Sequence, residues 1–212
     1  FKRGVEMDFP HTNGSTIFLS EHFINSIVPY FNNNDIDKCI RNIGSIIIHE
    51  TVHIWQRRDP EFFLSLYKKW RFQKYNKIIN SRQFKVKNRY NPDGVDLNWC
   101  FKDFKDNQYM LLSTYSENAK NISHVNLIGI EVEKLGIVPI IPPIPNIRRL
   151  SEINDFQDYF GDVGGNNYHP NELAAEIISM YVIEEMKLNT ITISSPAKLV
   201  FISHFKNYSG YK

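Results

Sequence analysis

Two histidines and a glutamate interrupt the apolar stretch IIIHETVHIWQR, which runs from residue 46 to residue 57. His49 and His53 are four residues apart, so on an α-helix they lie about 40° apart around the axis, one turn above the other. Two imidazoles placed in this way can bind one cation from the same helix face. Glu50 points about 100° away from His49, where it can reach a water held by that cation. The spacing therefore predicts a metal site with its own general base.

The residues around this motif indicate that the helix is buried. Isoleucines precede His49, and Val52, Ile54 and Trp55 surround His53. Burying two histidines and a glutamate without partners would be costly, and a shared metal ion would remove that cost. The alternative is a core helix whose histidines are satisfied by ordinary hydrogen bonds.

Zinc is the ion that this donor set favours, and we expect one Zn²⁺ per chain. Three protein ligands leave a fourth coordination position for water, whose pKa falls to about 7 on the metal. Glu50 would take a proton from that water as it attacks a carbonyl, and would then pass the proton to the leaving amine. The expected partner is therefore a peptide or protein substrate.

A second motif, YHPNELAAE, lies more than a hundred residues after His53. Glu172 and Glu176 are again four residues apart on a predicted helix, and Asn171 precedes Glu172. With both motifs present, the chain resembles the zincin metallopeptidases, specifically the gluzincin branch, whose second motif has the form NExxxD/E. The resemblance implies a zincin-like fold and zinc-dependent hydrolysis of peptide bonds. It also implies the site residues, which are His49, His53 and Glu172 as zinc ligands, Glu50 as general base, and Glu176 and Asn171 as supporting residues.

The residues themselves leave alternatives open around the second motif. Glu172 in isolation reads as a first-turn glutamate favoured by the helix dipole, and His169, Glu176 or another acidic residue could supply the third ligand instead. Tyr168 and His169 adjoin the predicted ligand helix and are the candidates for stabilising the oxyanion. The alternatives are core packing for Tyr168 and a helix cap for His169.

Capping residues and apolar spacing predict the helices that position both motifs. The first should run from about residue 36 to 57, after the polar cluster NNND, and a second should begin at Asp59-Pro60. The NELAAE helix should run from about 170 to 187. A last helix should follow Ser195-Pro196.

Alternating and β-branched residues predict strands elsewhere in the chain. A small antiparallel sheet is expected between about 84 and 134, inserted between the two motif helices. The segment STIFLS (15–20) resembles the edge strand that zincins use to align a peptide, although it reads equally well as an ordinary core strand. The predicted fold class is α+β, zincin-like and helix-rich, in a single domain spanning residues 1–212.

Positive charge is concentrated between Phe62 and Pro92, a stretch with nine Lys and Arg residues and no acidic residue. Cations interleaved with Trp70, Phe72 and Tyr75 can bind nucleic acid or an anionic surface. In that alternative function the metal site would be structural or lost. The simpler interpretation is a solvated face with its aromatic residues turned inward. A third is a basic surface that attracts acidic protein substrates.

Composition sets the remaining limits. The 212 residues are 42% hydrophobic, which is typical of a globular protein. No apolar run approaches the roughly 20 residues that span a bilayer. We therefore expect a soluble protein without a transmembrane segment. Cys39 and Cys100 form no CxxC pair and no disulfide framework, which favours a reducing compartment.

Overall fold

The computed structural model describes residues 9–33, 35–75, 87–89, 93, 99–115, 125–132, 147–163, 168–187 and 194–208. The helices are α1 (Glu21–Asn32), α2 (Ile36–Cys39), α3 (Ser45–Arg58), α4 (Pro60–Lys69), α5 (Asn154–Phe160), α6 (Pro170–Glu185) and α7 (Pro196–Asn207). The strands are β1 (His11–Asn13), β2 (Thr16–Phe18), β3 (Phe72–Lys74), β4 (Lys87–Asn88), β5 (Trp99–Lys102), β6 (Gln108–Tyr115), β7 (Val125–Val132) and β8 (Ile147–Arg149).

The helix predicted from residue 36 to 57 is present, but it contains one irregular turn. A π-helical turn, Ile40–Gly44, joins α2 to α3, and such turns often lie beside functional sites. A Cβ at Gly44 would lie 3.3 Å from Ile40 Cγ2 and 3.8 Å from Ile183 Cδ1 on α6. The tight contact is with Ile40 in the same π-helical turn, whereas the distance to Ile183 is an ordinary van der Waals contact.

The other predicted helix starts are confirmed by their caps. Asp59 Oδ1 accepts a hydrogen bond from the Phe62 amide at 3.2 Å, and α4 has a proline in its first turn. Ser195 caps α7 in the same way, through its hydroxyl oxygen. Two helices, α1 and α5, were not predicted. α1 forms although Pro29 lies inside it, where a proline removes an intrahelical hydrogen bond.

The main sheet is antiparallel, and it is wider than the sheet predicted between 84 and 134. Five strands follow the order β3-β5-β6-β7-β8, and the short β4 also pairs with β6. β3 and β8 extend the sheet beyond both predicted limits. The STIFLS segment contributes β2, which pairs with β1 in a separate hairpin.

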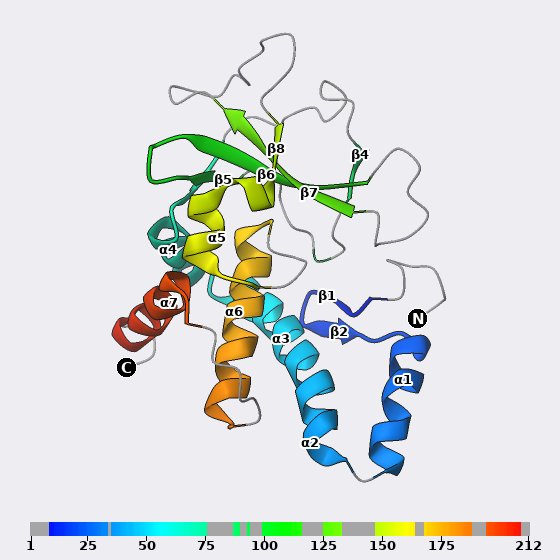
Figure 1. Ribbon diagram of the computed structural model, residues 1–212. Coiled ribbons are helices and arrows are strands. Elements are labelled where there is room, and N and C mark those ends of the chain that lie inside the picture. Colours follow the sequence, from blue (N-terminus) through cyan, green and yellow to red (C-terminus); the bar gives the residue numbers. More distant parts are fainter. Residues whose placement is uncertain are drawn as a thin grey trace.

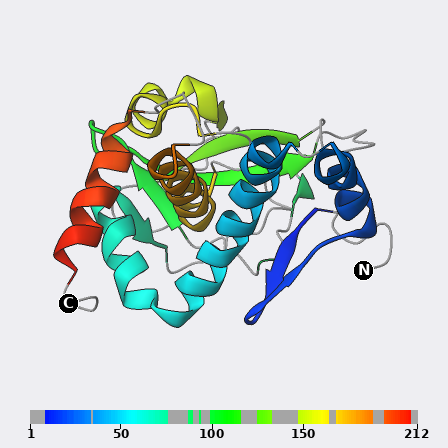
Figure 2. The same cartoon turned by 90° about the horizontal axis from the view of Figure 1, so that it is seen from below.

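The sheet lies on one side of the helices, and α3 and α6 pack against each other beneath it (Figures 1 and 2). Side chains on β6 alternate between two buried clusters, as period-two geometry requires. Tyr109 and Leu111 join the main core with α4, α5, α6 and α7, whereas Met110 and Leu112 join a smaller cluster on the other face. The main core thus braces the two motif helices.

The structure confirms a mixed α+β fold with an antiparallel sheet. The zincin-like architecture and the single domain stay predictions. Among the described residues, no helix is both long enough and apolar enough to cross a membrane. Cys39 and Cys100 are both buried free thiols.

The core makes a matched pair of phenylalanine substitutions informative. Phe101 is fully buried against Phe72, Phe156 and Phe160, whereas Phe31 is 63% exposed on α1. Phe101→Ala should lower the free energy of unfolding by about 3–5 kcal/mol, because it leaves a cavity. Phe31→Ala should change it by less than about 0.5 kcal/mol. Urea unfolding measures both, and similar losses would contradict this description of the core.

Candidate metal centre

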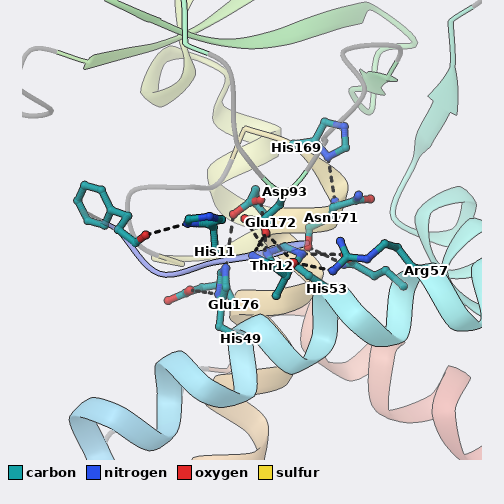
Figure 3. Close-up of polar contacts among 12 residues, drawn as sticks. His11, Thr12, His49, His53, Arg57, Asp93, His169, Asn171, Glu172 and Glu176 are labelled. Carbon is teal, nitrogen blue, oxygen red and sulfur yellow. Dashed lines mark hydrogen bonds and ion pairs between the residues drawn. The ribbon is translucent and has the colours of Figure 1, made fainter. Parts of the chain in front are cut away.

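The packing of α3 against α6 brings the two sequence motifs together. His49 and His53 extend from α3 toward Glu172 on α6, and Glu176 lies beside His49 (Figure 3). Glu172 and His53 are each 1% exposed, and the His49 side chain is 14% exposed. The residues that sequence reasoning selected as ligands therefore form one buried group.

The spacing of the three side chains fits a metal ion. His49 Nε2 lies 3.5 Å from Glu172 Oε2, and His53 Nε2 lies 3.5 Å from Glu172 Oε1. One ligand atom from each residue lies within 4.8 Å of the others. Ligand atoms about 2.1 Å from a tetrahedral zinc would be about 3.4 Å apart. His49, His53 and Glu172 could therefore hold a metal ion.

Gln56 fixes the ring of His53 in the orientation that a ligand needs. Gln56 Nε2 donates to the carbonyl of Asn171 at 2.8 Å, so its Oε1 is left to accept from His53 Nδ1 at 2.9 Å. The lone pair of His53 is then on Nε2, which is buried and has no hydrogen-bond partner among the described residues. Such an orphaned nitrogen, held by a bond at the opposite side of its ring, is typical of a metal-ligating histidine.

Glu176 contacts the ring of His49 as Gln56 contacts the ring of His53. Its Oε2 lies 3.2 Å from His49 Nδ1, while Nε2 of the same ring faces Glu172. A carboxylate in this position accepts the Nδ1 proton and makes the opposite nitrogen a stronger donor to a metal. This is the supporting place that the second motif implied for Glu176.

The carboxylates of Glu172 and Glu176 favour a positive charge between them and the histidines. Burial alone would lower the pKa of His49, but hydrogen bonds and charge from Glu172 and Glu176 outweigh it and raise the pKa to about 10. Burial would raise the pKa of Glu172, and the charges of His53 and His49 and a hydrogen bond from His49 lower it instead. A proton on His49 or a cation between the three residues can satisfy this demand.

Glu50 lies in a second group of potential ligand atoms, with His53 and Asp93. It is 4% exposed, and its Oε2 is buried with no hydrogen-bond partner in the described part of the chain. Burial, followed by the charge of Asp93, raises the pKa of Glu50 to about 8. Glu50 thus lies beside the triad, on the side of His53, and its role as general base stays a prediction.

Asp93, a residue that sequence reasoning used only to identify a turn, is anchored beside this group. Its Oδ1 accepts from the amide and hydroxyl of Thr12 on β1, at 2.6 and 2.7 Å, and its Oδ2 lies 4.0 Å from His53 Nε2. Arg57 on α3 donates to the Thr12 hydroxyl at 2.6 Å and to the Gly14 carbonyl at 3.0 Å. These bonds join α3, the hairpin and Asp93 at one side of the centre (Figure 3).

Sequence reasoning missed Gln56, Asp93, Thr12 and Arg57. For Gln56 a signal existed, because a residue three positions after His53 shares its helix face. For the other three, the contact joins distant parts of the chain. An aspartate in an NPDG turn ordinarily caps that turn, so its position beside His53 had no local signature.

The residues just before the second motif have structural tasks. His169 caps α6, with its Nδ1 accepting from the Asn171 amide at 3.1 Å, and in Figure 3 it lies apart from the triad. Tyr168 is 2% exposed and belongs to the main core. Asn171 contributes its backbone carbonyl to Gln56. The oxyanion role for Tyr168 and His169 stays a prediction.

The basic stretch between residues 67 and 90 falls partly outside the described residues. In the part that the structure describes, Trp70, Phe72 and Tyr75 are all buried, at 0%, 2% and 5% exposure. Rings in that position pack in the interior. The binding of nucleic acid or an anionic surface by this stretch stays a prediction.

Comparison of the chain with known protein families, with curated proteins and with solved structures found no match in any of the three. The triad geometry and the two motifs are therefore the grounds on which function is assigned.

Removing a ligand should remove the metal. The purified protein should hold about one zinc ion per chain after dialysis, and His53→Ala should hold almost none, because two ligands bind zinc far more weakly than three. His22→Ala changes an exposed histidine on α1 and should leave zinc content unchanged. Metal analysis by mass spectrometry measures both, and equal zinc content in the two variants would refute the assigned ligand set.

The hydrogen bond from Gln56 should set metal affinity. Gln56→Ala should weaken zinc binding about 10- to 100-fold, because the His53 ring loses the partner that orients it. Gln157→Ala removes an exposed glutamine that bonds the Gly161 carbonyl and should not change affinity. Competition with a coloured chelator gives the two dissociation constants. An unchanged value for Gln56→Ala would mean that the ring is oriented by other contacts.

Proposed function

We propose that this protein is a zinc-dependent metallopeptidase that hydrolyses peptide bonds, with Glu50 as the general base. The observation that carries the proposal is the convergence of His49, His53 and Glu172 within 4.8 Å, with an unpartnered Glu50 oxygen beside them. Ordinary core packing does not require three buried donors to face a common point. The HETVH and NELAAE motifs, which resemble those of the gluzincins, add independent support.

Zinc held by the triad would supply Lewis-acid chemistry, polarising a substrate carbonyl and lowering the pKa of water to about 7. Glu50 Oε2 is free to accept the proton of the attacking water, and the same oxygen can then deliver that proton to the leaving amine. Burial of Glu50 keeps competing bulk water away from the transfer. Gln56 and Glu176 hold the two rings still while this happens.

The hairpin beside the centre supports a peptide as the substrate. Within the described residues, β2 pairs only with β1, and β1 is bonded to Asp93 and to Arg57 through Thr12. An extended peptide can add to such a strand edge by main-chain hydrogen bonds. Since both strands contact α3, a peptide aligned there would pass close to the triad.

Replacing the base separates metal binding from catalysis. Glu50→Gln should keep its zinc and lose hydrolysis of a mixed peptide pool by about 10²- to 10⁴-fold, because the amide cannot accept the proton. The control is Glu61→Gln, an exposed first-turn glutamate on α4, which should retain activity. Mass spectrometry of the digested pool measures cleavage. Hydrolysis that survives in zinc-loaded Glu50→Gln would refute the mechanism.

A further inference from the structure

A cavity of about 220 Å³ lies beside the metal centre, and none of the tasks assigned above uses it. His53 and Asp93 line the end nearest the triad. Its walls are formed by large side chains of α4 and β5, which are Phe63, Leu64, Tyr67 and Trp99. Gln56, Arg57, Lys74 and Asn171 also line the cavity, so its lining is mixed and the aromatic side chains form the larger part of its apolar surface.

The cavity shares His53 and Asp93 with the group of ligand atoms that contains Glu50. His53 belongs both to the triad and to the group that contains Glu50 and Asp93, and Asp93 is not part of the triad. Asp93 Oδ2 lies 4.0 Å from His53 Nε2, on the same side as the unpartnered Glu50 oxygen. A carbonyl placed for attack by water activated at Glu50 therefore has Asp93 and the cavity next to it.

The walls of the cavity suit a flat, apolar group. Phe63, Tyr67 and Trp99 are 2%, 2% and 7% exposed, and the Tyr67 and Trp99 rings meet edge to face, 5.3 Å apart at 89°. Aromatic walls of this kind favour a further ring in an offset or edge-to-face position. An apolar cavity of about 150 Å³ is known to hold benzene, so 220 Å³ is large enough for a phenyl group.

The charges around the cavity disfavour other side chains. Lys74 and Arg57 lie at its rim, with Lys74 Nζ 5.5 Å from the centre of the Trp99 ring, and they would repel a basic side chain. An acidic side chain would be attracted by Lys74 and Arg57, but it would lose water on entering and would be repelled by Asp93 at the inner end. An uncharged ring meets neither cost.

We propose that this cavity binds the aromatic side chain of the substrate residue next to the cleaved bond, so that the enzyme selects phenylalanine-like residues at that position. This inference rests on the proposed peptidase function. Burial of a phenyl group in such a cavity should favour an aromatic residue over glycine by about 10- to 100-fold. Phe63, Leu64, Tyr67 and Trp99 are then the residues that determine specificity.

Binding of two hydroxamates to the zinc-loaded protein tests the proposal without a need for turnover. N-acetylphenylalanine hydroxamate and N-acetylglycine hydroxamate carry the same metal-binding group and differ only in the side chain. Calorimetry should show the phenylalanine compound binding about 10- to 100-fold more tightly. Equal affinities would overturn the cavity assignment and leave the metallopeptidase proposal standing. Failure of the protein to bind zinc, or of both compounds to bind, would overturn both proposals.

Filling the cavity should abolish the preference. Leu64 is partly buried at its wall, so Leu64→Trp should reduce the difference between the two compounds to less than about threefold. Leu199→Trp, at a 62% exposed position on α7, should leave the preference intact. Leu64→Ala acts in the opposite direction, and should improve binding of the tryptophan hydroxamate relative to the phenylalanine one. If Leu64→Trp does not fold, an unchanged order of affinities in Leu64→Ala overturns the assignment.

Discussion

The contact between α3 and α6 is the constraint on which the rest of the structure depends. It places the carboxylate of Glu172, 1% exposed, 3.5 Å from a nitrogen of each of two histidines on α3. Charges in such a place are stable only when they neutralise one another or share a cation. Side chains of α3 and α6 share the main core, which holds the two helices in register. Small changes in this packing would separate the triad.

Support around the triad is asymmetric, and the difference has a chemical meaning. The His49 ring rests on the carboxylate of Glu176, whereas the His53 ring rests on the neutral amide of Gln56. A carboxylate partner makes a histidine a stronger donor, while an amide orients the ring without adding charge. Because Asp93 already brings negative charge close to His53, a neutral partner there avoids a further unbalanced carboxylate.

Features set by neighbouring residues could be predicted from the sequence, whereas contacts between distant parts of the chain could not. The helices α3, α4, α6 and α7 have local signatures, in caps such as Asp59 and in the four-residue spacing of their ionisable groups. The pairing of HETVH with NELAAE could be predicted because both motifs are specific. Asp93, by contrast, reaches Thr12 across 81 positions of the chain, and the cavity walls come from α4 and β5. The residues next to Asp93 in the sequence give no sign of such contacts.

The centre also links function to stability. Among the described residues, His53 Nε2 and Glu50 Oε2 have no hydrogen-bond partner, and burying a polar atom in this way costs free energy. A cation in the triad would bind the folded state and not the unfolded one, so it would return that stability by mass action. The apolar residues of α3, Val52 among them, offset the cost in the meantime by packing into the main core. Val52 and Trp55 are therefore part of the site, because a helix less firmly packed could not keep these polar atoms buried.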